Sequence, residues 1–191
     1  MRYYLITQDK GYTKVPKILD AFKVLSLNNT KPPSAKNLER RTIITMKAEE
    51  DTVYTDILAG TLFLVSKKMK ECMELFEPNL KFKEIILLEK TRREKQHYFL
   101  PQLQELDCLT ENSVYGFGHM ELTKIEIAEE KLKDKAIFRI AGMEKDYIIA
   151  RLDMVESLLR RGIKGMSLKE VQVRKSGVEG GISCQKKNSI W

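Results

Sequence analysis

The sequence predicts an α+β fold in which a mixed sheet carries a few flanking helices. Short apolar and β-branched runs recur along the chain, and such runs are typical of strands. Two stretches have the three- and four-residue apolar spacing of amphipathic helices. Because these helices lie far apart in the chain, an α+β arrangement is favoured over a regular doubly wound parallel sheet.

The first part of the chain is predicted to begin with a strand. Residues 2–7 are aromatic and β-branched and are followed by Gly11, which indicates an opening strand. The run 16–29 fits a short helix or a strand. Residues 28–40 contain two adjacent prolines and few apolar side chains, so we expect a loop there. A strand is predicted at residues 41–47.

A strand–helix–strand unit follows at residues 61–90. Residues 62–65 form a short apolar run that suits a buried strand, and Ser66 is placed to cap the next helix through its hydroxyl. Pro78 and Asn79 end that helix, and residues 82–88 are predicted to form a central strand because they are largely apolar. The apolar stripe of the helix consists of Met69, Cys72, Met73 and Phe76.

The middle of the chain has weaker patterns. Pro101 argues against a central strand running through residues 97–109, because proline cannot donate to the ladder. The other elements expected here are a loop at 110–119, a half-exposed strand at 120–128, a short helix or turn at 129–135 and a strand at 136–142.

Residues 147–173 repeat the strand–helix–strand order. At an offset of 85 positions, Leu64 aligns with Ile149 and Met69 with Met154. We therefore predict one α+β domain over residues 1–173, with possible related halves 1–110 and 111–173, and a flexible tail over 174–191. The predicted core is Leu62, Phe63, Val65, Met69, Met73, Phe76, Phe82, Ile86, Phe138, Ile148, Leu158 and Val171.

The composition indicates a globular chain with a mildly basic surface. Of its 191 residues, 42% are hydrophobic and 32% charged, and the net charge is +7. Part of this positive charge lies in the predicted tail, so the charge on the rest of the chain is a weaker indication of a nucleic-acid-binding surface. No apolar run has the length of a membrane span, and no signal-peptide core follows Met1, so we expect a cytoplasmic protein without a membrane partner. Three widely spaced cysteines suggest neither disulfides nor a zinc site.

A search for catalytic groups yields no candidate, and we expect no catalytic, cofactor-binding or metal-binding residue. His97 and His119 have no serine or cysteine nucleophile motif nearby. The single GFG beside His119 lacks the third glycine of a dinucleotide loop. Cys108 lies between apolar residues and is expected to be packed and unreactive.

The stretch SLLRRGIKGMSLKEV, residues 157–171, resembles a phosphate contact but fits a helix end. Arg160 and Arg161 fall in the last turn, where cations favour the negative end of the helix dipole. Gly162 suits the left-handed C′ position that terminates many helices. Arg161 and Lys164 are expected to be exposed, and we predict that they contact a partner protein.

Four short pieces of the sequence carry a resemblance to a known family: Asp56 in TDIL, Val65–Ser66, Phe138 with Arg139, and RRGIKGMSL. Through these pieces, and through the order and spacing of its segments over residues 2–173, the chain resembles a bacterial immunity-protein family of polymorphic toxin systems, formerly a domain of unknown function. One departure is Thr55, which stands where the resemblance leads us to expect proline.

The resemblance implies a non-catalytic cytoplasmic protein that binds and neutralises a cognate toxin. Opposite potentials speed the encounter of two proteins, so the basic charge of the chain favours a neutral or acidic toxin. The alternatives are a nucleic-acid-binding module, suggested by the charge and the cluster around Arg161, and an enzyme without a recognised motif. Aromatic side chains interleaved with the basic residues, as single-strand binding would need, are largely missing there.

Overall fold

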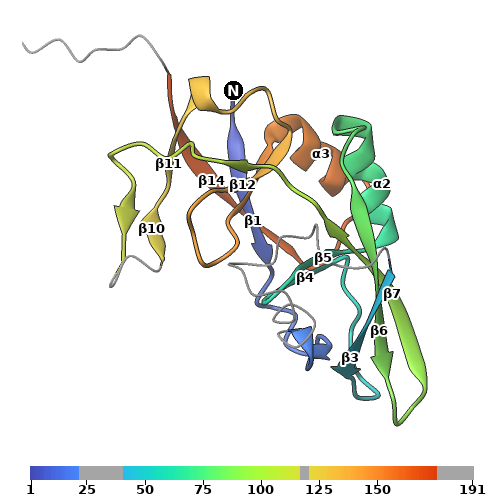
Figure 1. The fold of residues 1–191 in the computed structure, drawn as a ribbon. Helices are drawn as coiled ribbons and strands as arrows, with labels where there is room; N and C mark the ends of the chain where they lie inside the picture. Colours follow the sequence, from blue (N-terminus) through green and yellow to red (C-terminus); the bar gives the residue numbers. More distant parts are fainter. Residues whose placement is uncertain (22–40, 117–120, 176–191) are drawn as a thin grey trace, which may run out of the picture.

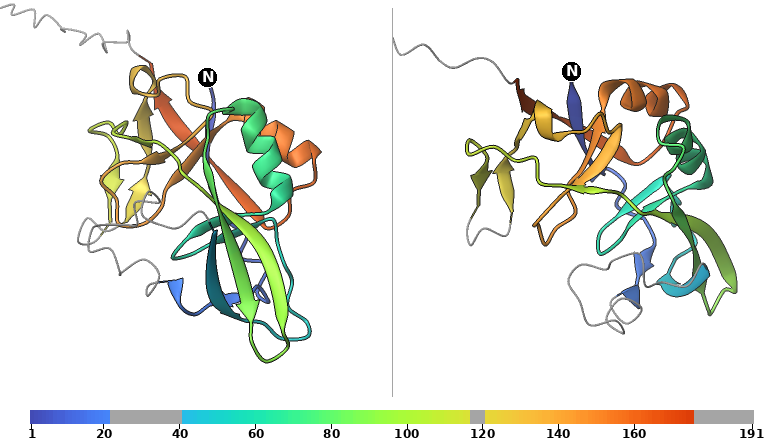
Figure 2. Two further views of the ribbon diagram at one scale, coloured as in Figure 1. Left: turned by 45° about the vertical axis from the view of Figure 1, so that its right-hand side comes forward. Right: turned by 45° about the horizontal axis from the view of Figure 1, so that its top comes forward.

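The computed structural model describes residues 1–21, 41–116 and 121–175. Among these residues strands dominate, and two α-helices pack against each other on one side of the described part of the chain (Figures 1 and 2). This composition agrees with an α+β fold. Within the described ranges no helix is long and apolar enough to cross a membrane.

One six-stranded sheet contains the N-terminal strand and the C-terminal part of the domain. β1 lies in its interior and pairs antiparallel with both β13 and β14, while β11 pairs parallel with the end of β14. In spatial order its strands are β11 (Glu126–Ala128), β14 (Met166–Arg174), β1 (Tyr3–Gln8), β13 (Ile148–Arg151), β12 (Ile137–Ile140) and β8 (Glu105–Leu106).

The second six-stranded sheet is mixed. β6 pairs parallel with β3 and antiparallel with β7, which confirms that residues 82–88 form a central strand. A separate two-stranded sheet consists of β9 (Val114–Tyr115) and β10 (Leu122–Lys124). In spatial order the mixed sheet contains β2 (Lys17–Ile18), β3 (Arg41–Lys47), β6 (Phe82–Glu89), β7 (Glu94–Pro101), β5 (Phe63–Val65) and β4 (Ile57–Ala59).

The helices that lie wholly within the described residues are α2 (Lys67–Phe76) and α3 (Leu152–Arg160), with a short 3₁₀ turn, η3, at Glu129–Lys131. α2 connects β5 to β6, and both strands pair antiparallel with β7 between them. α3 connects β13 to β14, which in the same way flank β1. The two strand–helix–strand units therefore share one topology, and Cys72 Sγ lies 3.5 Å from Ser157 Oγ, its counterpart at the offset of 85 residues.

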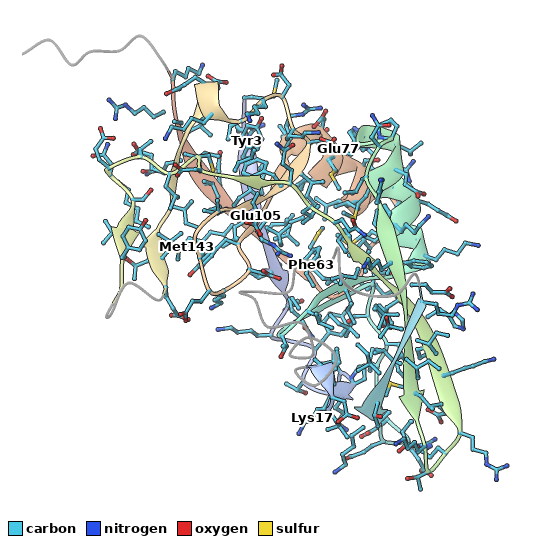
Figure 3. All side chains as sticks on the ribbon, viewed as in Figure 1. Tyr3, Lys17, Phe63, Glu77, Glu105 and Met143 are labelled. Atoms are coloured by element: carbon cyan, nitrogen blue, oxygen red, sulfur yellow. The ribbon has the colours of Figure 1, made fainter. Side chains whose placement is uncertain are left out.

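The main core lies where the helices meet the two sheets. It joins Phe63 of the mixed sheet, labelled in Figure 3, to Ile148 of the other sheet through Met69 and Leu158 of the helices. β1 and β8, from residues 1–110, belong to the sheet that contains β12, β13 and β14. The boundary between the sheets therefore does not fall at residue 110.

Nine of the twelve predicted core residues are buried, and Phe76, Phe82 and Ile86 are only half-buried. The prediction that Ile86 lies in the core was wrong, because successive side chains of β6 point to opposite faces of the sheet. Ile85 points to the buried face, and Ile86 pairs with His97 and Ile43 on the outer face.

Several boundaries also differ from the predictions. β7 is an interior strand that ends at Pro101, where a missing amide disturbs only the last rung of the ladder. Residues 120–128 were predicted as one strand, but β10 and β11 belong to different sheets. Residues 110–119 include β9, so they are not all loop.

The last strand is longer than expected. β14 extends to Arg174, whose guanidinium pairs with Glu111, so residue 174 itself belongs to this strand. Residues 176–191 of that tail, the whole of the predicted loop at 28–40, and His119 lie outside the described residues.

Candidate functional site

The candidate site lies where α3 ends and α2 begins. β4 and β5 form an antiparallel hairpin in which Ile57 pairs with Val65, so the flanking residues Asp56 and Ser66 are neighbours in space. The turn after α3 brings Lys164 to the same place. Three of the four pieces that carry the family resemblance thus meet at one junction.

Asp56 is the centre of this junction. One carboxylate oxygen accepts a 2.6 Å hydrogen bond from Ser66 Oγ, and the other accepts a 2.8 Å bond from the backbone N–H of Lys164. The backbone of Asp56 donates to Lys164 O at 3.0 Å and accepts from Ser66 N at 2.8 Å. Asp56 therefore fixes both the start of α2 and the turn that follows α3.

Ser66 caps α2 as predicted. Its hydroxyl oxygen accepts a hydrogen bond from Met69 N at 3.2 Å, and its backbone is extended, as an N-cap requires. The same hydroxyl donates to Asp56. The cap thus links the helix to the junction and does not act only within α2.

The end of α3 confirms that the stretch around Gly162 terminates a helix. Gly162 has a φ of 63°, its N–H donates to Leu159 O at 2.8 Å, and Ile163 N donates to Leu158 O at 3.2 Å. This pair of bonds is the Schellman motif. Ile163 is buried and packs back on the core, so the turn has a fixed direction.

Gly165 packs directly on Thr55. Its φ is 80°, and a Cβ at this position would lie 2.5 Å from Thr55 Cβ. The hydroxyl of Thr55 donates to Ile57 O at 2.7 Å, and its carbonyl accepts from Tyr98 OH at 2.7 Å. Thr55 is therefore built into the junction, although the resemblance led us to expect proline there. Gly165 O also accepts from Asp9 N at 2.9 Å, which attaches the end of β1.

Arg161 and Lys164 are both exposed at this junction. The Arg161 guanidinium contacts Ser157 Oγ, one turn earlier in α3. Lys68, which the sequence search did not single out, donates from Nζ to Gly162 O at 3.2 Å and so lies beside them. Its position in the first turn of a predicted helix, where cations are unfavourable, was a signal that could have identified it. Contact of these side chains with a partner remains a prediction.

The other chemically reactive residues do not converge here. His97 Nδ1 lies 2.8 Å from Glu84 Oε1 on the outer face of the mixed sheet. Hydrogen bonds from Arg41 and His97 hold the pKa of Glu84 below its ordinary value. Cys108 is buried as expected, and burial raises the pKa of its thiol to about 11. Among the described residues no cluster of three or more His, Cys, Asp or Glu side chains could hold a metal ion.

The fourth piece of the resemblance lies elsewhere, in β12. Phe138 is fully buried with Tyr3 edge-on to its ring at a centroid distance of 6.1 Å. The Arg139 side chain lies between Asp146, with Nε 3.1 Å from Oδ1, and Glu105, with Nη1 3.6 Å from Oε1. Burial raises the pKa of Asp146. This piece supports the first sheet and is separated from β1 by β13.

The fold and the junction define a small α+β protein in which a rigid hydrogen-bonded frame supports exposed cationic side chains. The chain belongs to the Immunity protein family (Imm11), whose family model matches residues 2–173. The match confirms the resemblance seen in the sequence. It indicates an immunity protein, suggests a toxin as partner in general and suggests a non-enzymatic role. No curated protein matches the chain.

Proposed function

We propose that the chain binds a cognate toxin domain in the cytoplasm of the bacterium that makes both, and neutralises it as a one-to-one complex without catalysis. The observation that carries this proposal is the match of the immunity-protein family to residues 2–173. In this proposal, protection comes from occupying or covering the toxin, so it requires a shaped surface and no reactive group.

The junction supports a binding role because it fixes the backbone beneath the exposed residues. Association of two proteins is opposed by the loss of freedom of any loop that becomes ordered on binding. Asp56 holds the Lys164 backbone through both its N–H and its C=O, and the Schellman turn fixes Gly162. We infer that Arg161 and Lys164 meet the toxin from this preformed turn.

The proposal is tested by co-expression in a toxin-sensitive bacterium. The toxin domain encoded immediately upstream of this chain should stop growth when expressed alone, and growth should return when the chain is expressed with it. Purified together, the two proteins should elute as a one-to-one complex. A toxin that kills cells equally with and without the chain would contradict the proposal.

A matched variant separates binding from catalysis. His97→Gln/His119→Gln removes both histidines of the chain and should protect cells as well as the natural sequence does. Because His97 lies beside Glu84 on the outer face of the mixed sheet, the loss of its side chain leaves the junction intact. Loss of protection in this variant with normal folding and normal toxin binding would favour an enzyme.

We propose further that the two strand–helix–strand units are related halves of one domain. Their shared topology supports this, as does the contact of Cys72 with Ser157, its counterpart at the offset found in the sequence.

A further inference from the structure

We propose that a basic surface formed by α2 and α3 is the docking site for an acidic patch on the toxin. This surface, here called the basic end, consists of Lys67, Lys68, Arg160, Arg161 and Lys164. The inference rests on the proposed function and adds to it the location of the interface and the chemistry of the partner.

The basic end exists because the helices run antiparallel. Lys68 of the first turn of α2 contacts Gly162, just after α3, and Cys72 contacts Ser157 one turn further along. The start of α2 therefore lies beside the end of α3, as the ribbons in Figures 1 and 2 also show. Asp56 fixes this arrangement by binding both Ser66 and Lys164.

The charges of α3 follow the helix dipole, and those of α2 oppose it. α3 has Asp153 in its first turn and Arg160 in its last, an order that stabilises a helix. α2 begins with Lys67 and Lys68 and has no acidic residue in its first turn. Its ion pair Lys67–Glu71 also has the less favourable order, with lysine on the N-terminal side. Helix stability therefore explains the arginines, and the contact of Lys68 with Gly162 O at the end of α3 explains Lys68 in part, but Lys67 has no such explanation.

The two ends of the helix pair also differ in how their charges are neutralised. At the far end, marked by Glu77 in Figure 3, Glu77 pairs with Lys135 at 2.9 Å and Asp153 with Arg151 at 2.8 Å. Both cations come from outside the helices. The far end is therefore balanced by its own neighbours.

At the basic end the neutralisation is incomplete. Five cations face three carboxylates, and the contacts of Glu71 and Glu156 are long, at 3.8 Å from Lys67 Nζ and 3.9 Å from Arg160 Nη2. The third carboxylate, Asp56, already accepts hydrogen bonds from Ser66 and the Lys164 backbone. A surplus of exposed positive charge remains.

An apolar side chain lies on the same helix face as this charge. Leu75 is 65% exposed and follows Lys68 by seven residues, so it lies on the same side of α2 as Lys68, two helical turns towards the far end. Protein interfaces combine such apolar contacts with complementary charge. The partner that fits is a protein surface on which carboxylates lie next to an apolar patch.

A nucleic acid fits this surface less well. Glu71 and Glu156 stand among the cations and would repel a phosphate backbone. The aromatic residue of the two helices is Phe76, and it packs against the core, so it cannot stack on a base. The apolar Leu75 gains nothing from contact with phosphates.

The test compares three variants that each remove positive charge from exposed residues. Lys67→Gln/Lys68→Gln and Arg161→Gln/Lys164→Gln alter the basic end, and a combined variant carries all four changes. The control, Lys90→Gln/Lys95→Gln, removes two exposed charges from the β6–β7 hairpin, whose turn points away from the helices (Figure 1). Glutamine has nearly the helix propensity of lysine, so folding is little affected.

The probe is the upstream toxin domain, carrying an inactivating substitution and labelled for stopped-flow fluorescence. Against it, the combined variant should associate about tenfold or more slowly than the natural chain at low salt, and its rate should depend less on salt. The control should match the natural chain. The urea midpoint of Lys67→Gln/Lys68→Gln should change little, because removing two unfavourable charges from the start of α2 offsets the loss of the Lys68 hydrogen bond to Gly162 O.

The outcomes separate the inference from the function beneath it. If the natural chain binds the toxin and the combined variant binds with the same rate and affinity, the basic end is not the interface, although the proposed function stands. If the natural chain fails to bind or protect, the proposed function itself fails. Loss of binding together with a lower urea midpoint in Lys67→Gln/Lys68→Gln would assign the lysines a structural role and overturn the inference. Binding of the basic end to a DNA or RNA duplex, and not to the toxin, would also overturn it.

Discussion

Gly165→Ala gives a direct test of the junction. Gly165 lies between the end of α3 and the start of β14, with a φ of 80° and with Thr55 against its Cα. An added methyl group therefore meets two obstacles at once. The backbone conformation is one that L-residues rarely adopt, and the space for a Cβ is already filled.

The expected loss of stability is the sum of these two effects. A left-handed conformation costs an L-residue about 1–2 kcal/mol. The new Cβ would lie 2.5 Å from Thr55 Cβ and 2.8 Å from its Cγ2, and Thr55 is held by its hydrogen bond to Ile57 O. Overpacking of this kind costs about 1–3 kcal/mol. We therefore expect the free energy of unfolding to fall by about 2–5 kcal/mol.

Gly142→Ala is the matched control. Gly142 has a similar φ of 75°, but nothing lies within 4 Å of the position of its Cβ. This change should cost only the backbone strain, about 1–2 kcal/mol. Urea denaturation followed by circular dichroism measures both variants, and the difference between them reports the contact with Thr55. If Gly165→Ala lowers the free energy of unfolding by no more than Gly142→Ala does, the inference that Gly165 packs closely on Thr55 is wrong.

Three further predictions concern the same junction and the second core. Asp56→Ala should lower the free energy of unfolding by about 0.5–1.5 kcal/mol for each hydrogen bond lost, from Ser66 Oγ and from the Lys164 N–H, and Asp56→Asn should cost less. Equal losses for the two variants in urea denaturation would contradict this hydrogen-bonding scheme. Ser66→Ala should cost about 0.5–2 kcal/mol in the same assay, whereas no loss would mean that the cap does not stabilise α2. Burial raises the pKa of the Cys108 thiol from 9.0 to about 11, so this thiol ionises at lower pH in the unfolded chain than in the folded one. The contribution of Cys108 to the free energy of unfolding is therefore fully present below pH 9 and is lost as the pH rises through 11. The thiol should therefore resist a disulfide reagent at pH 8 until urea unfolds the protein, and equal reactivity in the folded state would refute its burial.

Local patterns in the sequence were enough to find most elements and to place the ends of the helices. The Ser66 cap and the Gly162 helix end depend on residues a few positions apart, so each could be predicted from its own stretch. The alternation of β6 was harder to read, because Ile85 and Ile86 are equally apolar and only the packed sheet decides which is buried.

The candidate site could be predicted only in part. Arg161 and Lys164 were expected to be exposed because they follow a helix end, and they are. Lys68 was missed, since its importance depends on Gly162, which lies 94 residues away. The sequence also contained the lysines that oppose the α2 dipole, but which charges gather beside them depends on how the helices pack.

The sequence by itself determined the class of fold, the order of its elements and, through four short pieces, the family. These properties depend on local spacing and composition, which tertiary contacts change little. Only the tertiary structure decided that Asp56 binds a turn 108 residues further along, and that Gly165 must be glycine because Thr55 fills its space. Side chains so far apart in the chain can meet in many ways, and only the packing of the two sheets through α2 and α3 selects one of them.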